Sequence, residues 1–107
     1  MIHAVKFEIT FAPETVAHLE AMARKHHRLI QKTIAEQLRY TPDKKTRNRK
    51  PLEEPTSFGA SWELRFGPDN CFRVFYEVDR AEGKVEILAI GIKERNRLFI
   101  GGEEFEL

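Results

Sequence analysis

Three stretches of β-strand periodicity in the second half of the chain constrain its fold more than any other feature. Residues 62–66 and 72–78 alternate apolar and polar side chains, which is the pattern of a strand with one buried face. Residues 85–94 are apolar on both faces, as expected of a strand at the centre of a sheet. Residues 67–70 and 79–83, which separate these three stretches, are of the types that form turns. Strands joined by such short turns pair with their neighbours, so this region predicts an antiparallel meander.

The first 40 residues predict one strand followed by two helices. Residues 2–11 show the same alternation, and we expect this strand to pair with an edge of the meander. Pro13 begins a helical segment that continues to about Arg39, with apolar residues at spacings of three, four or their multiples. Residues 24–28 lack a good apolar anchor, so we expect a break or a tight corner there.

The remaining segments are predicted to be irregular. Residues 41–61 contain three prolines and are expected to form a long loop, of a length that is usually functional or mobile. Residues 101–107 are expected to lie over an edge of the sheet or to stay mobile. The predicted fold class is therefore α+β, in the order βααβββ, with a helical hairpin packed on a twisted antiparallel sheet. We expect residues 1–107 to form a single domain.

Composition narrows the class of protein. The chain has 107 residues, of which 41% are hydrophobic and 33% charged, as in globular proteins with a core. Its longest uncharged apolar stretch, Ile87–Ile92, is too short to span a membrane, and the N-terminus resembles neither a signal nor a transit peptide. The single cysteine, Cys71, excludes an intrachain disulfide, so we expect a cytoplasmic protein. The four histidines lack the spacing of metal ligands, and we expect no metal and no cofactor.

A basic block lies inside the predicted loop. Residues 41–50 carry five Lys or Arg side chains against one Asp, although the net charge of the chain is only +1. Clustered cations bind nucleic acids by displacing counterions from phosphates, whereas the alternative is an ordinary solvated loop. The candidate phosphate contacts are Lys44, Lys45, Arg47, Arg49 and Lys50.

A second charged constellation is predicted on the meander itself. If the registers match and no bulge intervenes, Glu63, Arg65, Arg73 and Lys93 share one face of the sheet. Three cations around a carboxylate suit a phosphodiester, on which negative charge grows in the transition state. The alternative is cross-strand ion pairing that only stabilises the sheet.

The segment WELRFGPDNCFRVFYEVDRAEGKVEILAIGIKERNRLFIGG resembles the C-terminal half of the RelE/ParE superfamily of bacterial type II toxins. Residues 72–76 and 89–95 are its most specific parts, and the resemblance covers about residues 2–100. It implies a RelE/ParE-like fold and a toxin that a cognate antitoxin holds inactive. In the RelE branch it also implies an endonuclease that cuts mRNA in the ribosomal A site by attack of the ribose 2′-hydroxyl on the adjacent phosphate.

The resemblance assigns roles to individual residues. Arg73 and Lys93 match basic positions that contact the scissile phosphate, and Arg95 in the same cluster is an expected RNA contact. Phe99 falls where these enzymes carry a tyrosine, and it is expected to stack on a base. Ser61 and Glu63 stand where they carry lysines. Glu63 is therefore a candidate general base, with His26 or His27 as alternatives if the helical corner approaches the cleft.

The resemblance leaves different function classes open. The RelE-like ending at residues 91–95 favours a ribosome-dependent mRNA endonuclease, with the antitoxin, the ribosome and mRNA as partners. The missing lysines and tyrosine favour the ParE branch, whose toxins inhibit DNA gyrase without acid–base chemistry. A degenerate member with a regulatory role is a third alternative, and the oligomeric state stays open.

Overall fold

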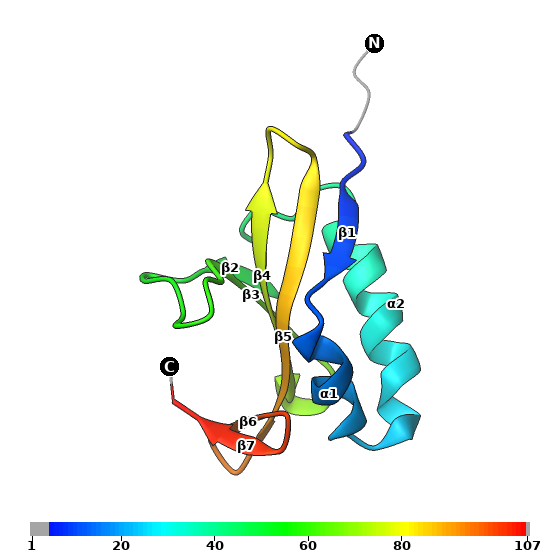
Figure 1. Ribbon diagram of the computed structural model, residues 1–107, viewed down its shortest axis with the longest axis vertical. Helices are drawn as coiled ribbons and strands as arrows, with labels where there is room; N and C mark the ends of the chain where they lie inside the picture. The colour runs from blue at the N-terminus through cyan, green and yellow to red at the C-terminus, as the bar shows by residue number, and fades with distance from the viewer. Residues whose placement is uncertain (1–4, 107) are drawn as a thin grey trace.

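Strand β5 (Lys84–Glu94) joins the two parts of the sheet in the structure, a computed structural model that describes residues 5–106 (Figure 1). Within those residues, seven strands form one sheet, and α1 (Glu14–Glu20) and α2 (His27–Leu38) pack on one of its faces. The antiparallel strands lie in the order β2 (Arg49–Pro51), β3 (Trp62–Phe66), β4 (Phe72–Asp79), β5, β6 (Arg97–Ile100) and β7 (Glu103–Phe105). The α+β class, the helical hairpin and the meander β3–β4–β5 are thus confirmed.

Strand β1 (Glu8–Phe11) runs parallel to the first half of β5. It pairs with residues 84–87, and β6 pairs with residues 91–94 on the same edge of β5. The predicted strand 2–11 was too long, because the backbone N–H of Phe7 donates to the carbonyl of Arg39 at the end of α2, at 2.7 Å. Residues 1–4 of that prediction lie outside the described residues.

A β-bulge changes which side chains of β5 face the helices. Phe75 pairs with Ala89 and Tyr76 with Ile87, so Leu88 is the extra residue. Before the bulge, Val85 and Ile87 belong to the core beneath the helices, whereas Ala89 after it belongs to a second cluster on the opposite face. The condition that no bulge intervenes was therefore wrong, and the bulge helps both faces of β5 to be apolar.

The helices bury a narrow apolar stripe. Ile30, Ile34 and Leu38 of α2 recur every four residues and are at most 1% exposed. Helix α1 ends at Glu20, and a single 3-10 turn, Arg24–His26, leads into α2. This confirms the predicted corner. None of the helices in residues 5–106 is long and apolar enough to cross a membrane.

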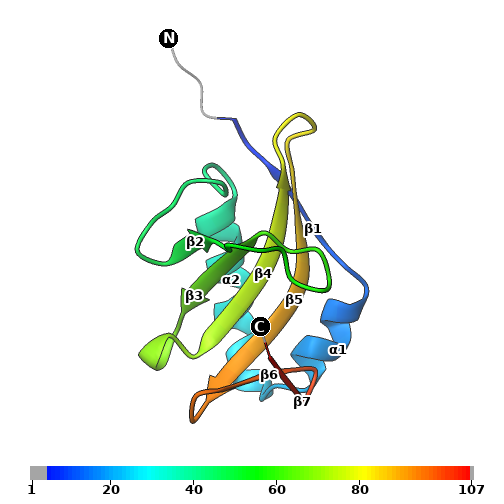
Figure 2. The ribbon, with the colours of Figure 1, turned by 90° about the vertical axis from the view of Figure 1, so that its left-hand side faces the viewer.

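Two segments predicted to be irregular contain strands. Three residues of the long loop form β2, which pairs with β3. The C-terminal residues add β7 through a Gly101–Gly102 turn in which both φ angles are positive (64° and 82°). Figure 2 looks onto the face opposite the helices, where the loop after β2 crosses the sheet. There Phe58 packs edge-on against Phe75 and Phe105, so this face has a small core of its own.

Candidate functional site

The site is built around Glu63 of β3, whose side chain is 3% exposed and lies on the face opposite the helices. Among the described residues, three cations lie within 4.0 Å of its carboxylate. Arg65 Nε donates to Oε1 at 2.8 Å, Arg73 Nη1 lies 3.4 Å from Oε2, and Lys50 Nζ lies 3.8 Å from Oε1. The expected meeting of Glu63, Arg65 and Arg73 is therefore confirmed, and Lys50 joins them from β2.

Arg73 is held in place from two sides. It lies on β4 opposite Gly91, and its Nε donates to the carbonyl of Asn70 at 2.9 Å. A Cβ at Gly91 would lie 2.8 Å from the carbonyl oxygen of Phe99, so glycine lets β6 approach β5 closely. The guanidinium is thus fixed by a backbone carbonyl and by Glu63, and the residue is 9% exposed.

Lys93 completes the site at the end of β5. Its backbone N–H donates to the carbonyl of Cys71 at 2.7 Å, which ties Lys93 to the start of β4. Arg73 and Lys93 line two adjacent cavities of about 380 and 350 Å³. We call these two cavities together the Arg73–Lys93 cleft. Glu63 lines the larger cavity, so all four residues of the predicted constellation belong to this site or contact it.

The tip of the β5–β6 hairpin forms one wall of the cleft. Arg95 and Asn96 make a two-residue turn with φ angles of 51° and 66°, the geometry of a type I′ turn. Both residues are exposed and both line the smaller cavity beside Arg73 and Lys93. The tip thus adds Arg95 to the rim of the cleft, and Arg97 beside it lines the larger cavity.

Residues of strand β7 and the one after it also line the cleft. Glu104 and Glu106 line the larger cavity with Arg73 and Lys93, and Glu104 Oε1 lies 3.7 Å from Arg97 Nε. The sequence analysis missed these residues because it expected no strand there. A usable signal was present, since a Gly-Gly pair between two strand-like runs is typical of a β-hairpin.

The basic block divides into outward and inward residues. Lys44, Lys45 and Arg47 are exposed, as expected of phosphate contacts. Arg49 is 6% exposed, and its Nη1 donates to the carbonyls of Gln37, at 2.7 Å, and of Thr41. Its expected role as a phosphate contact was wrong, because the side chain is occupied in joining the loop to the end of α2.

Two further contacts hold the basic loop against the body of the protein. Arg80 Nε and Nη2 donate to the two carboxylate oxygens of Asp43 at 2.7 and 2.6 Å. These hydrogen bonds from Arg80 lower the pKa of Asp43. The hydroxyl of Tyr76 donates to the carbonyl of Pro42 at 2.6 Å, and burial raises the pKa of this tyrosine. The cations of the loop are thus presented from an anchored segment.

Phe99 and the two histidines do not join the cleft. Phe99 pairs with Ile92 on β5, and both belong to the face that carries the helices. His26 packs against Phe72 with ring centroids 5.0 Å apart, and His27 Nε2 lies 3.1 Å from the carbonyl of Met22. Phe99 therefore lies on the other face of the sheet from Arg73, and its expected stacking on a base stays a prediction. Neither His26 nor His27 lines the cleft, so the condition on which a histidine was an alternative general base is not met.

The charges of the cleft suit an anionic ligand. Guanidinium and ammonium groups bind phosphate oxygens through charge-assisted hydrogen bonds, and a fixed guanidinium stabilises charge that develops on a phosphoryl group. Within residues 5–106, no three His, Cys, Asp or Glu side chains gather so as to hold a metal ion. The geometry can therefore position a phosphodiester through Arg73, Lys93 and Arg95.

Comparison with solved structures finds the same fold in a toxin–antitoxin complex. The match is to a chain of RelBE2 from Mycobacterium tuberculosis, with a TM-score of 0.68 and 19% sequence identity. It covers 83% of this chain and 93% of the other. This confirms the RelE/ParE-like fold that the resemblance implied. No protein-family model and no curated protein matches the sequence.

Proposed function

We propose that this chain is the toxin of a toxin–antitoxin pair, and that it acts in the cytoplasm as an endonuclease on ribosome-bound mRNA. The observation that carries the proposal is the Arg73–Lys93 cleft, where cations from adjacent strands line a cavity open to solvent. Arg73 is fixed by Glu63 and Asn70 before any ligand binds, so it costs little reorganisation to meet a phosphate.

The reaction follows from the chemistry of RNA. The ribose 2′-oxygen attacks the adjacent phosphorus, the bond from phosphorus to the 5′-oxygen breaks, and a 2′,3′-cyclic phosphate and a 5′-hydroxyl result. Arg73 and Lys93 stabilise the charge that grows on the phosphoryl oxygens. The Lys93 ammonium also supplies a proton to the leaving 5′-oxygen.

The 2′-hydroxyl proton needs a different acceptor from the one that the sequence suggested. Glu63 is buried and shared among Lys50, Arg65 and Arg73, so it acts as a positioning residue. Glu104 is the better candidate, because it is half exposed and is a lining residue of the same cavity as the two cations. General acid–base catalysis by a positioned side chain contributes about 10²–10⁴ to the rate.

An antitoxin is the proposed partner. The cleft and the exposed residues of the basic loop present cations that an acidic segment would neutralise. The solved structure of the same fold is a toxin–antitoxin complex. We expect the gene to lie beside one for a small DNA-binding protein, and the two products to co-purify. A gene with no such neighbour, whose product is harmless when expressed alone, would instead indicate a degenerate regulatory member.

Single-turnover cleavage of mRNA on programmed ribosomes tests the proposal. Arg73→Ala should slow cleavage by about 10²–10³, the scale of losing one preorganised donor, with a much smaller change in ribosome binding. Ribosome and mRNA binding by the basic loop should survive in this variant.

A gyrase supercoiling assay in parallel tests the second candidate function. Inhibition of DNA gyrase is favoured by one observation: Phe99 stands where the enzymes carry a tyrosine, and it lies off the cleft. If the wild-type protein cleaves no mRNA and abolishes supercoiling, the endonuclease proposal fails in favour of gyrase inhibition.

A further inference from the structure

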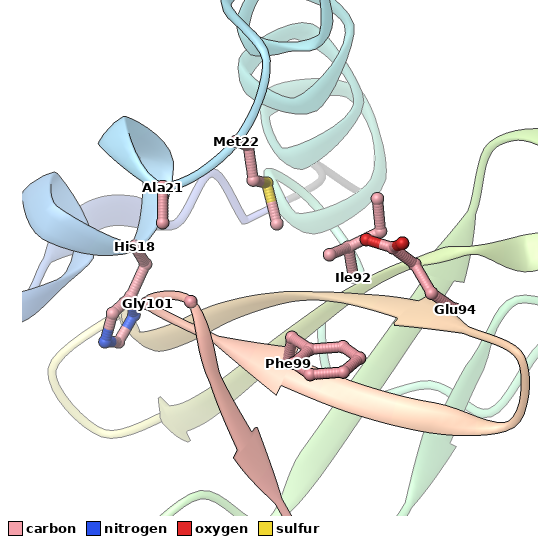
Figure 3. A pocket seen from close by; sticks show the side chains of 8 residues that line it. His18, Ala21, Met22, Ile92, Glu94, Phe99 and Gly101 are labelled. Carbon is pink, nitrogen blue, oxygen red and sulfur yellow. The ribbon is translucent and has the colours of Figure 1, made fainter.

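Apart from the cleft, apolar side chains line a cavity on each face of the sheet. On the helix side, a pocket of about 250 Å³ is lined by Met22, Ile92 and Phe99, which Figure 3 shows together with His18 and Glu94. On the opposite face, a groove of about 430 Å³ lies between the segment after β2 and the end of β7. Charge distinguishes the two. Among the described lining residues, the pocket has one glutamate and the groove has three.

Three apolar residues line the groove on the face opposite the helices. Leu52 and Phe105 pack against the small core of this face, yet both stay partly exposed, and Pro55 is exposed. We call this cavity the Leu52–Phe105 groove. Apolar surface that solvent still reaches gains free energy when a partner covers it. The groove therefore offers a place for an apolar side chain of a partner.

Hydrogen bonds hold the wall of the groove in one shape. The N–H of Leu52 donates to the carbonyl of Ser61 at 2.8 Å, which fixes the start of the segment. The N–H of Thr56 donates to the carbonyl of Ala60 at 2.9 Å, and the Thr56 hydroxyl accepts from the Ala60 N–H at 3.0 Å. Within this turn, Phe58 packs edge-on against two further phenylalanine rings. A wall that is ordered before binding lowers the entropic cost of binding.

The rim of the groove is acidic. Its described lining residues include Glu53, Glu54 and Glu106 and no Lys or Arg. All three glutamates are exposed, and none of them forms an ion pair within residues 5–106. Their charges repel phosphates, so the groove does not suit RNA. Lysine and arginine suit it, because their aliphatic stems pack on apolar surface while their charges stay at the rim.

The groove and the Arg73–Lys93 cleft share a wall. Phe105 and Glu106 line the groove and also the larger cavity of the cleft. The two cavities differ in the sign of their charge, because Arg73 and Lys93 line only the cleft. A partner in the groove would therefore lie next to the cleft without using its cations.

We propose that the Leu52–Phe105 groove binds a basic peptide segment of a protein partner, in which an apolar side chain is flanked by lysine or arginine. The apolar side chain contacts Leu52, Pro55 and Phe105, and the flanking cations lie against the three glutamates. Opposite charges steer such a segment to the groove and disfavour other segments. The proposal goes beyond the proposed function and does not depend on it, because RNA and an acidic antitoxin segment are complementary to the cleft.

Fluorescence anisotropy with labelled pentapeptides tests whether such a segment binds. The probe Lys-Arg-Leu-Arg-Lys should bind, and its affinity should fall several-fold between about 50 and 200 mM salt, because salt screens exposed charges. Replacing the leucine of the probe by alanine should weaken binding about 5-fold, because less apolar surface is buried. If the two probes bind equally, the apolar walls contribute nothing and the proposal is overturned.

NMR titration of the wild-type protein shows where the probes bind. The basic probe should shift backbone amide signals of residues 52–57 and 105–106. The acidic probe Glu-Glu-Leu-Glu-Glu should leave those of residues 52–57 unchanged. If the basic probe shifts none of these signals at saturating concentration, or if only the acidic probe shifts residues 52–57, the proposal is overturned.

Matched double variants test the contribution of the glutamates. Glu53→Gln with Glu54→Gln should weaken binding of the basic probe about 5-fold, the scale of losing two exposed ion pairs. Glu14→Gln with Glu20→Gln changes the net charge equally, at exposed positions of α1 on the other face of the sheet, and should leave the affinity unchanged. Equal effects of the two double variants would mean that net charge attracts the probe, and would overturn the proposal.

Arg73→Ala distinguishes this proposal from the proposed function. The variant should slow mRNA cleavage and leave binding of the basic probe unchanged. If the wild-type protein cleaves no mRNA but binds the probe in the groove, the proposed function fails and the groove proposal stands. If it cleaves mRNA and the probe shifts no groove signal, the groove proposal alone fails.

Discussion

Glu63 is the residue on which the geometry of the cleft depends. Its carboxylate is buried and faces Lys50, Arg65 and Arg73 from three strands. Burying such an ion cluster costs desolvation free energy. Removing one of its ions leaves the remaining charges buried without a counter-charge. The carboxylate therefore offsets the repulsion that would otherwise separate the cations of the site.

Glu63→Gln tests this role through stability. The substitution keeps the volume of the side chain and removes its charge, so we expect the free energy of unfolding to fall by about 3 kcal/mol. Urea unfolding measures the change. Glu36→Gln is the control, because Glu36 makes an exposed i,i+4 pair with Lys32 at 3.8 Å, which is worth less than about 0.5 kcal/mol. Equal stability of Glu63→Gln and the wild type would show that solvent screens the cluster.

Arg49 and Arg47 are two residues apart and are expected to act differently. Arg49→Ala removes a buried side chain and its hydrogen bonds to the carbonyls of Gln37 and Thr41, and should lower the free energy of unfolding by about 3 kcal/mol. Arg47→Ala removes an exposed side chain and should leave stability within about 0.5 kcal/mol. Arg49→Lys should recover only part of the loss, because an ammonium lacks the planar fork of donors. Thermal and urea unfolding of the three variants would reveal any reversal of this order.

His18 makes stability depend on pH. Burial lowers its pKa in the folded state below 6.5, so the unfolded chain binds a proton more readily. Stability from this residue is therefore present above pH 6.5 and is lost as the pH falls from there to the lower pKa of the folded state. Glu14, whose charge raises the His18 pKa, moderates the effect. As the pH is lowered from 8 to 5, the melting temperature should fall less steeply for His18→Asn than for the wild type.

At the scale of elements, the β6–β7 hairpin adds acidic groups to a basic site. Its Gly101–Gly102 turn packs beside α1, with an added Cβ at Gly101 lying 3.4 Å from the His18 ring. Phe105 anchors the strand against Phe58, with ring centroids 5.4 Å apart. Glu104 thereby lies at the larger cavity of the cleft, 3.7 Å from Arg97 Nε, and its negative charge opposes the approach of a phosphate.

Glu104→Gln separates two roles of this strand. Loss of a negative charge from the cleft should tighten RNA binding several-fold, since like charges repel. If Glu104 also accepts the 2′-hydroxyl proton, the single-turnover cleavage rate should fall by about 10²–10³ at saturation. Glu103→Gln, which alters an exposed carboxylate of the same strand, is the control. Tighter binding with an unchanged rate would mean that Glu104 acts on affinity alone.

At the scale of the whole molecule, the basic loop and the cleft are distinct cationic surfaces. The loop is tied to the body of the protein through Asp43, Arg49 and Tyr76, whereas the cleft is built from strands. Loop contacts to phosphates should govern affinity, and cleft contacts should govern the chemical step. The two surfaces can therefore be altered separately.

A triple variant of Lys44, Lys45 and Arg47 to Ala tests this division. Each phosphate contact to a single strand contributes about 0.7 to the slope of log K against log salt concentration, so the slope should fall by about 2. Binding should weaken at low salt, and the cleavage rate at saturation should stay unchanged. Titrations between 50 and 200 mM salt provide the measurement. A slope equal to that of the wild type would mean that the loop is merely solvated.

The sequence by itself determined the elements whose signal is local. The meander β3–β4–β5 was predicted because each strand repeats its apolar residues with period two, and the corner before α2 was predicted because an apolar anchor is missing there. The convergence of Glu63, Arg65 and Arg73 followed from the same parity. These features depend on the period within each strand and on short turns, which make strands that are adjacent in the sequence pair with each other.

Tertiary structure alone decided the features that depend on distant partners. Strand β2 has three residues, too few to show a period, so the burial of Arg49 and the placement of Lys50 beside Glu63 were not predictable. The bulge at Leu88 shifts parity by one residue without any composition signal, and Phe99 faces the helices because β6 pairs it with Ile92. Periodicity shows which residues share a face within one strand, whereas strand pairing decides which faces of different strands meet.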